Sequence, residues 1–563
     1  MKVVIVGGVA GGASAAARIR RLDEKAEIVV FERSGYISYA NCGLPYYIGG
    51  VIEDPEDLTL QTPESFLERF NVQMKVHHEV TAVHPERKTV SVKNLETGAQ
   101  FEESYDKLLL APGAKPVKPR LPGIDLDRIF TLRTVEDTFR IREFVTAQKP
   151  KTAVLVGGGF VGVELAENLT ELGIQVTLVE MLDQIMSPFD ADMACYLHAK
   201  MREKGVTLML GCAVKGFEKA GDQLRVELDG RPALTADMAA LAIGVAQDTA
   251  FARDAGLAQG LKGSIAVNDR METSVPDIYA VGDAVQVKHL VTGADALVSM
   301  AGPANKQGRI AADNICGGDS RYPGAQGTLV TKLFDMTAAA CGLNERTAKA
   351  AGIDCDKVFL SPSNHAGYYP GGALMCMKVL FERGTNRLIG AQIVGYEGVD
   401  KRIDVLATAI QCGMTAPALK ELDLAYAPPY SSAKDPVNMV GFMTENVAKG
   451  VLKQFFYDDE EALPRDGSVT LLDVRTPEEV AGGRADGFVN IPVDELRGRL
   501  AEIAKDKPVY VMCQSGLRSY IACRILAQEG YDCFNFSGGY RKYAAQHSDR
   551  LAAKQAMPCG ADK

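Results

Sequence analysis

Runs of apolar residues that end in glycines and lead into an amphipathic pattern occur twice along the chain. "KVVIVGGVAGGASAAARIRRL" at 2–22 and "TAVLVGGGFVGVELAENLTELG" at 152–173 each predict a buried strand, a glycine turn and a helix. A further apolar run follows each helix, "AEIVVFE" and "QVTLVE", and each of these ends in a glutamate. The pattern predicts two units in which parallel strands are joined by a helix.

Other apolar runs extend this plan along the chain. "YDKLLLAPGAKP" at 105–116, "DMAALAIGVAQDT" at 237–249 and "TSVPDIYAVGDA" at 273–284 resemble strands that close such units. A fresh alternation of strands and helices starts near residue 466, in "VTLLDVRTPEEVAGGRADGFVNIPV" and "KPVYVMCQSGLRSYIACRILAQEGYDCFNFSGGYRKY". We therefore expect an α/β protein of several domains, as its 563 residues also suggest.

Composition excludes several classes of function. A formal net charge of −10 argues against a surface that binds nucleic acid or an anionic membrane. No apolar run reaches the roughly 18 residues of a transmembrane helix, and glycines 7, 8, 11 and 12 fit a phosphate-binding turn better than a signal peptide. The twelve cysteines form no CxxC pair, so we expect no metal site and place the chain in a reducing cytoplasm.

The second glycine turn has the spacing of a dinucleotide site. Gly157, Gly159 and Gly162 form GxGxxG, and Glu180 ends the next strand. Such glycines let the backbone approach a pyrophosphate at a helix N-terminus, while the acidic residue bonds ribose hydroxyls.

The first turn departs from that spacing. Gly7, Gly8 and Gly12 are present, but Val9 takes the middle glycine position, and Glu32 ends the following strand. One such motif alone is weak evidence, whereas two complete units indicate two dinucleotides, one held permanently and one exchanging.

These motifs together resemble the flavoprotein disulfide reductase superfamily, whose members bind two dinucleotides. The resemblance implies an FAD-binding domain (1–112 and 245–322), an NAD-binding domain (113–244) and a dimerisation domain (323–448), with a homodimer as the assembly. It implies that FAD lies along Gly7, Gly8, Gly12, Glu32, Arg33, Val80, Ala111 and Asp283.

Glu180 also bears on the choice of nicotinamide cofactor. A carboxylate there accepts a bond from the 2′-hydroxyl of NADH and repels the 2′-phosphate of NADPH. The following "EMLDQ" offers no arginine for that phosphate, so NADH is preferred.

A single cysteine stands in "SYANCGLPYY", residues 38–47. A lone cysteine is by default a small buried residue, but Cys42 follows Glu32 by ten positions, where this superfamily carries its redox cysteine. Without a second cysteine nearby, it resembles the branch of coenzyme A disulfide reductases, NADH oxidases and NADH peroxidases. No histidine stands in "FERSGYISYAN", which disfavours the peroxidase.

Several polar residues favour coenzyme A within that branch. Ser14, Arg18 and Arg21 share one face of the first helix; a solvated face is the alternative. The resemblance assigns those positions to the phosphates of coenzyme A, with Ser38 and Asn41 nearer the thiol.

Two tyrosines lie in the expected dimerisation domain. In the coenzyme A disulfide reductases, paired tyrosines of the partner subunit sit by the redox cysteine, and Tyr368 and Tyr426 match them. Simple packing at a dimer seam is the alternative. Lys434 is a further candidate contact for coenzyme A, and Asn305 is a weaker one.

The C-terminal alternation resembles a rhodanese domain (466–550), after a linker (449–465) and before a tail (551–563) that holds Cys559. Cys513 ends a strand and opens the loop "CQSGLRS", whose N–H groups and Arg518 would stabilise a thiolate or persulfide. Asp473 and Arg475 are expected to brace the loop. The loop is too short for a Cdc25-type phosphatase.

Together these features predict an NADH-dependent flavoprotein that reduces coenzyme A persulfide or polysulfide and releases hydrogen sulfide, with sulfur delivered by Cys513. The alternatives are a coenzyme A disulfide reductase for thiol balance, a sulfurtransferase for biosynthesis, and a redox-sensing flavoprotein that binds a partner.

Overall fold

The computed structural model describes residues 1–555, and these divide into two compact units. The first unit comprises residues 1–183 and 205–325, and the second comprises residues 184–204 and the chain from 326 onward. No helix in the described part of the chain is both long and apolar enough to cross a membrane.

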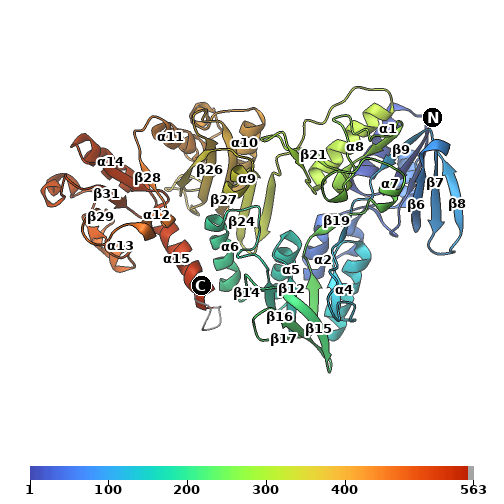
Figure 1. The fold of residues 1–563 in the computed structure, drawn as a ribbon, viewed down its shortest axis with the longest axis horizontal. Coiled ribbons are helices and arrows are strands. Elements are labelled where there is room, and N and C mark those ends of the chain that lie inside the picture. The colour runs from blue at the N-terminus through green and yellow to red at the C-terminus, as the bar shows by residue number, and fades with distance from the viewer. Residues whose placement is uncertain (556–563) are drawn as a thin grey trace. The chain divides into compact units, whose positions relative to one another are not determined.

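The first unit contains two parallel five-stranded sheets (Figure 1). One has the order β20-β9-β1-β2-β5, with strands Ile278–Ala280, Lys107–Leu110, Lys2–Val6, Glu27–Phe31 and Gln73–Lys75. The other has the order β11-β18-β12-β13-β14, with strands Ile129–Thr131, Met238–Leu241, Thr152–Val156, Gln175–Val179 and Thr207–Met209. Seven of these ten strands, all except β5, β11 and β14, lie in the apolar runs seen in the sequence, and their apolar side chains are buried.

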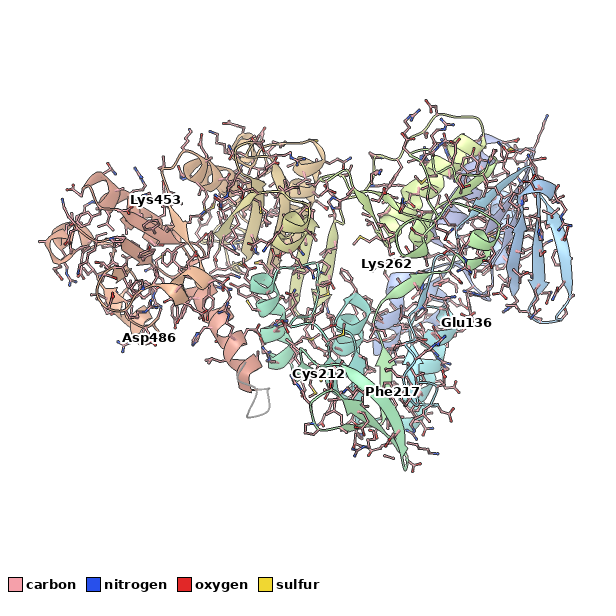
Figure 2. All side chains as sticks on the ribbon, viewed as in Figure 1. Glu136, Cys212, Phe217, Lys262, Lys453 and Asp486 are labelled. Carbon is pink, nitrogen blue, oxygen red and sulfur yellow. The ribbon has the colours of Figure 1, made fainter. Side chains whose placement is uncertain are left out.

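Helices and small antiparallel sheets cover these two sheets. The helices are α1 (Ala10–Leu22), α2 (Leu44–Gly49), α3 (Pro63–Phe70), α4 (Val135–Gln148), α5 (Phe160–Glu171), α7 (Ala250–Asp254) and α8 (Ala301–Ile315). The antiparallel sheets are β6 (His78–His84), β7 (Thr89–Asn94) and β8 (Gln100–Ser104), and β15 (Val214–Ala220), β16 (Gln223–Leu228) and β17 (Leu234–Ala236). Cys212 and Phe217, labelled in Figure 2, are buried in the core shared by β12, β13, β18 and the second of these sheets.

Short strands complete the first unit. They pair as β3 (Ile37–Tyr39) with β4 (Thr59–Gln61), β10 (Ala114–Pro116) with β19 (Val245–Gln247), and β21 (Val287–Lys288) with β22 (Asp295–Ala296). The β10–β19 pair lies where the chain leaves the sheet that contains β1 and returns to it, close to the predicted boundaries at 112 and 245.

The second unit begins with an antiparallel sheet of order β23-β24-β27-β26-β25. Its strands are Leu329–Leu333, Met336–Gly342, Leu388–Gly395, Cys376–Glu382 and Cys355–Leu360. The helices of this part are α6 (Ala191–Glu203), α9 (Glu345–Ala350), α10 (Val399–Gln411) and α11 (Pro436–Ala448).

A parallel sheet of order β28-β32-β31-β29-β30 forms the C-terminal part. Its strands are Gln454–Phe455, Cys533–Phe536, Val509–Met512, Thr470–Asp473 and Val489–Asn490, with helices α12 (Tyr457–Ala462), α13 (Pro477–Ala481), α14 (Leu517–Gln528) and α15 (Gly539–Gln555).

The boundaries of this part differ from expectation at both ends. The predicted linker contributes β28 and α12, because Phe455 and Tyr457 are buried in the core of the C-terminal part. The predicted tail begins inside α15, and from residue 556 onward, Cys559 included, it lies outside the described residues.

Candidate functional site

The first glycine turn has no room for side chains. Gly7 has φ +95°, and a Cβ there would lie 2.1 Å from the carbonyl oxygen of Ala111. A Cβ on Gly12 would lie 1.9 Å from the carbonyl oxygen of Gly7. At the end of β2, Glu32 accepts a hydrogen bond from the Gly8 N–H at 2.8 Å, and burial raises the pKa of its carboxyl. A tight backbone turn beside a buried carboxyl fits the pyrophosphate and ribose of a dinucleotide.

The other residues predicted to hold FAD lie in the same unit. Asp283 follows β20, and burial raises its pKa, although Arg133, whose Nη2 lies 3.4 Å away, opposes the rise. Val80 is buried in β6. Arg33 instead pairs with Asp248 at 3.0 Å, so its guanidinium is already partly neutralised.

The second glycine turn repeats the close approach of backbone. A Cβ on Gly162 would lie 2.0 Å from the carbonyl oxygen of Gly157, whereas one on Gly159 would meet no atom within 4 Å. Glu180 accepts from the Gly158 N–H at 2.6 Å. The open space at Gly159 faces the start of α5, as a second dinucleotide site requires.

Cys42 is exposed in a short 3₁₀ turn, Asn41–Gly43, directly before α2. The turn is tied to the first glycine turn, because the Ser38 N–H donates to the carbonyl oxygen of Gly8 at 2.9 Å. Ser38 has φ +45°, a left-handed conformation that non-glycine residues seldom adopt. Cys42 is therefore an accessible thiol held near the FAD-type turn.

Charged groups from other elements surround this thiol. Burial raises the pKa of Cys42, the Glu164 carboxylate raises it further, and Arg133 opposes both. Glu164 lies on α5, and burial, with the neighbouring Glu167, raises its pKa to about 7. The charge next to Cys42 therefore changes near neutral pH.

The residues predicted to contact coenzyme A are partly engaged with one another. α1 packs against α8, and this brings the Ser14 hydroxyl into a hydrogen bond with Asn305. Arg18 pairs with Asp313 of α8 at 2.7 Å, while Arg21 is exposed at the end of α1. Ser14 and Asn305 thus form one polar site, and Arg21 is the freer cation.

Tyr368 and Tyr426 come together in the second unit. Their hydroxyl groups lie 2.8 Å apart, and the side chains are 75% and 47% exposed. Lys434 is also exposed. Paired phenols at a surface can donate a proton to a group that arrives from another molecule.

The C-terminal loop holds a thiol away from solvent. Cys513, at the end of β31, is fully buried, and its Sγ accepts from the Gly516 N–H at 3.1 Å and the Ser519 hydroxyl at 3.2 Å. Donors of this kind stabilise a thiolate.

Arg518 does not donate to Cys513. Its two terminal nitrogens each lie 2.7 Å from a carboxylate oxygen of Glu479, on α13, and this pairing lowers the pKa of Glu479 to about 2. Arg475 is buried and bonds Asp473 at 2.7 Å, as expected for residues that brace the loop.

Sequence reasoning missed Arg133, Glu164, Glu479 and Ser519. The first three reach their sites from elements distant in the chain, so no local pattern marks them. Ser519 follows Arg518 directly, and its place as the third residue of α14 was the available signal.

Comparison with known proteins gives the family. The family model of pyridine nucleotide-disulphide oxidoreductases matches residues 1–302, more than half of the chain. The chain belongs to this family. The oxidoreductase also matches the family's dimerisation domain at 329–436 and a rhodanese-like domain at 458–546. The family uses FAD and a nicotinamide dinucleotide, which fit the two glycine turns.

Similar proteins match all or most of this chain. The oxidoreductase is 39% identical to a coenzyme A disulfide reductase of Staphylococcus aureus over 445 residues, 78% of this chain and 99% of that one. The solved structure of reduced Bacillus anthracis CoADR-RHD superposes with a TM-score of 0.95 at 47% identity, covering 98% of each chain. A NAD-dependent persulfide reductase from A. fulgidus superposes with a TM-score of 0.91 at 38% identity, covering 96% of this chain and 100% of that one.

Proposed function

We propose that this oxidoreductase uses NADH to reduce coenzyme A persulfide, or polysulfide through it, and releases hydrogen sulfide. The observation that carries the proposal is that the chain has two different thiols. Cys42 is exposed and has no neighbouring cysteine, and Cys513 is buried in a rhodanese-like domain. A single thiol forms its S–S bond with a substrate, and a persulfide-carrying loop supplies sulfane sulfur. The names of the similar proteins support the same substrate class.

Each step balances at the sulfur atoms. The Cys42 thiolate attacks the outer sulfur of coenzyme A persulfide, an S–S bond forms on Cys42, and the coenzyme A thiolate leaves and takes up a proton. Two electrons and two protons then convert the Cys42 persulfide to a thiol and hydrogen sulfide. Bound FAD would supply those electrons, drawn from NADH.

The chain's own residues bind and orient the reactants. Glu32 and Glu180 would accept ribose hydroxyls of FAD and NADH, and the absence of an arginine after Glu180 favours NADH over NADPH. Ser14, Asn305 and Arg21 would receive coenzyme A.

The proposal also includes the assembly and the cellular compartment of the protein. The chain would act as a cytoplasmic homodimer in which Tyr368 and Tyr426 of the partner subunit donate a proton to the sulfur that leaves.

The proposal is tested by measuring NADH oxidation and sulfide release with coenzyme A persulfide, using the wild-type holoenzyme and Cys42→Ser. We expect Cys42→Ser to lose both signals by at least about a thousandfold, the size typical of a lost nucleophile. Undiminished sulfide release by this variant would sink the proposal. Cys513→Ser should keep the reaction with coenzyme A persulfide but slow the one with inorganic polysulfide.

The alternatives give other outcomes. A coenzyme A disulfide reductase would turn over the disulfide as fast as the persulfide or faster. A biosynthetic sulfurtransferase would lose transfer to a protein acceptor in Cys513→Ser while releasing sulfide from polysulfide as before.

A further inference from the structure

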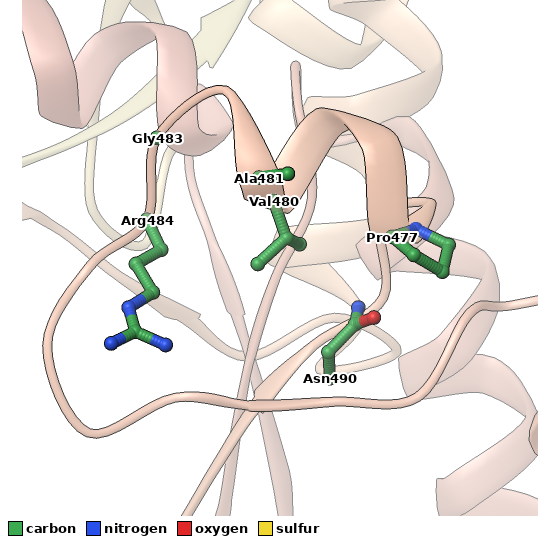
Figure 3. Close-up of a pocket in the computed structure, with 6 residues that line it drawn as sticks. All are labelled: Pro477, Val480, Ala481, Gly483, Arg484 and Asn490. Atoms are coloured by element: carbon green, nitrogen blue, oxygen red, sulfur yellow. The ribbon is translucent and has the colours of Figure 1, made fainter.

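A pocket of about 500 Å³ lies at the carboxyl edge of the C-terminal sheet (Figure 3). β29, β30 and β31 run parallel and end at Asp473, Asn490 and Met512, so Cys513 and the pocket share this edge. In open α/β sheets ligands bind outside the carboxyl ends of the strands. The pocket is lined by Pro477, Val480, Ala481, Gly483, Arg484 and Asn490.

The lining offers one cation, one acceptor and an apolar wall. In Figure 3 the side chains of Val480 and Asn490 point toward each other below α13, and Arg484 extends into the same space. Arg484 is exposed and has no ion pair with any described residue. The Asn490 amide N–H groups donate to the carbonyl oxygens of Asp473 and Arg475, both at 2.9 Å, so its carbonyl oxygen remains for a ligand.

One buried guanidinium connects this pocket to the Cys513 loop. Arg475 donates to the carbonyl oxygen of Gly483 at 2.9 Å and to the side-chain oxygen of Gln514 at 3.4 Å. It also stacks on the ring of Tyr540 at 3.9 Å, and the Tyr540 N–H donates to the carbonyl oxygen of Cys513 at 2.6 Å.

The distance between the pocket and the Cys513 thiol limits the length of the ligand. β29 lies between β31, which precedes Cys513, and β30, which ends at Asn490. Two strand spacings put the pocket roughly 10 Å from the thiol. A ligand could therefore hold its anion at Arg484 and its sulfur at Cys513 only if a short flexible body joins them.

We propose that this pocket binds the organic body of an anionic low-molecular-weight persulfide, the sulfur donor of the C-terminal domain. The proposal rests on the sulfur-transfer role of Cys513. The Cys513 thiolate bonds the donor's outer sulfur, the donor S–S bond breaks, and the leaving thiolate takes up a proton, with no net oxidation. Arg484 pairs with the donor's anionic group, and Val480 packs against its chain.

Thiocyanate formation from cyanide tests the pocket with the full-length holoenzyme and no NADH. Arg484→Gln should raise KM for glutathione persulfide about tenfold, as expected for the loss of one charge-assisted contact. KM for inorganic tetrasulfide, which has no organic body, should stay within about twofold of wild type on the same grounds. Arg497→Gln, at another exposed arginine of this domain, should change neither value.

A second measurement tests binding directly, in case the protein transfers no sulfur to cyanide. S-Methylglutathione should bind the Cys513→Ser holoenzyme in calorimetry, and Arg484→Gln should weaken that binding. If Arg484→Gln acts on coenzyme A persulfide alone, the anion is a phosphate and the proposal stands for that donor. Unchanged KM for both organic persulfides, or no binding of S-methylglutathione, would overturn it. If the wild-type protein shows no NADH-dependent reduction but Arg484→Gln still raises KM for the organic persulfide, only the proposed reductase function is contradicted.

Discussion

At the scale of single residues, the two reactive thiols have different surroundings. Burial raises the pKa of Cys42, the nearby Glu164 carboxylate raises it further, and Arg133 lowers it. Cys513 instead has two short-range donors, Gly516 and Ser519. The exposed thiol is therefore the one whose acidity depends on a nearby titrating group.

Glu164→Gln should make Cys42 more acidic. The carboxylate raises the Cys42 pKa only while it is charged, and its own pKa is about 7. Below pH 7 the variant should behave as wild type, and above pH 7 it should alkylate faster, by about three- to tenfold. The measurement is the iodoacetamide rate at Cys42 against pH, by mass spectrometry. Glu171→Gln, exposed at the end of α5, is the control and should superpose on wild type.

Ser519→Ala should remove a hydrogen-bond donor from the Cys513 thiolate. The hydroxyl donates to Sγ at 3.2 Å, and removing a donor to the charged form disfavours the thiolate. We expect sulfur transfer to slow by about tenfold, because a hydrogen bond to a charged group is lost. Sulfur transfer at the wild-type rate would show that the Ser519 hydroxyl does not stabilise the thiolate.

These residues show which features of the sites could be predicted from the sequence. Glycine spacing and the acidic residue after the next strand are local signals, so both dinucleotide turns, Glu32 and Glu180 could be predicted. The environment of Cys42 depends on Arg133 and Glu164, which are brought to it by folding. For Arg518 the sequence shows a positive charge near Cys513, but its pairing with Glu479 depends on how α13 packs against the loop.

At the scale of elements, the glycine turns fix how closely each helix follows its strand. Gly162 and Gly157 are in contact across the turn before α5, and this closeness leaves no volume for a methyl group. Gly159, in the same turn, has open space and φ −79°, which any residue adopts.

Gly162→Ala should therefore destabilise the NAD-type sheet, whereas Gly159→Ala should not. A Cβ 2.0 Å from a carbonyl oxygen forces the backbone apart, and overpacking of this kind costs about 1–3 kcal/mol. The check is thermal unfolding of the FAD-loaded protein, with a lower Tm for Gly162→Ala only. Equal melting of both variants would contradict the contact.

At the scale of the second unit, α15 of the C-terminal part is fixed to α6 by buried polar groups. Lys542 is 2% exposed and donates to the carbonyl oxygen of Asp192. Asp549 accepts from His198 at 2.8 Å and from Arg202 at 2.6 Å. His198 in turn accepts from the Ile185 N–H through its other ring nitrogen. The rhodanese-like domain is thus docked by specific contacts as well as by its chain connection.

Asp549→Ala should loosen this docking. His198 would keep a buried N–H without a partner, and Arg202 would lose its counter-ion, at a cost of about 2–4 kcal/mol. We expect faster hydrogen exchange in α15 and α6. Asp532→Ala, which removes an exposed pair with Lys453, should change little, because such pairs contribute at most about 1 kcal/mol. Unchanged exchange in α15 of Asp549→Ala would show that the docking depends on packing alone.

The hydrogen bond between the hydroxyl groups of Tyr368 and Tyr426 leaves one of their hydrogens unused. The pair owns two hydroxyl hydrogens, and a single hydrogen bond between them uses one. The second hydrogen always remains on the outer oxygen, directed away from the pair. In the proposed reduction this hydrogen would be available to a sulfur anion that arrives there, and the phenolate left behind would accept the hydrogen bond of the other tyrosine.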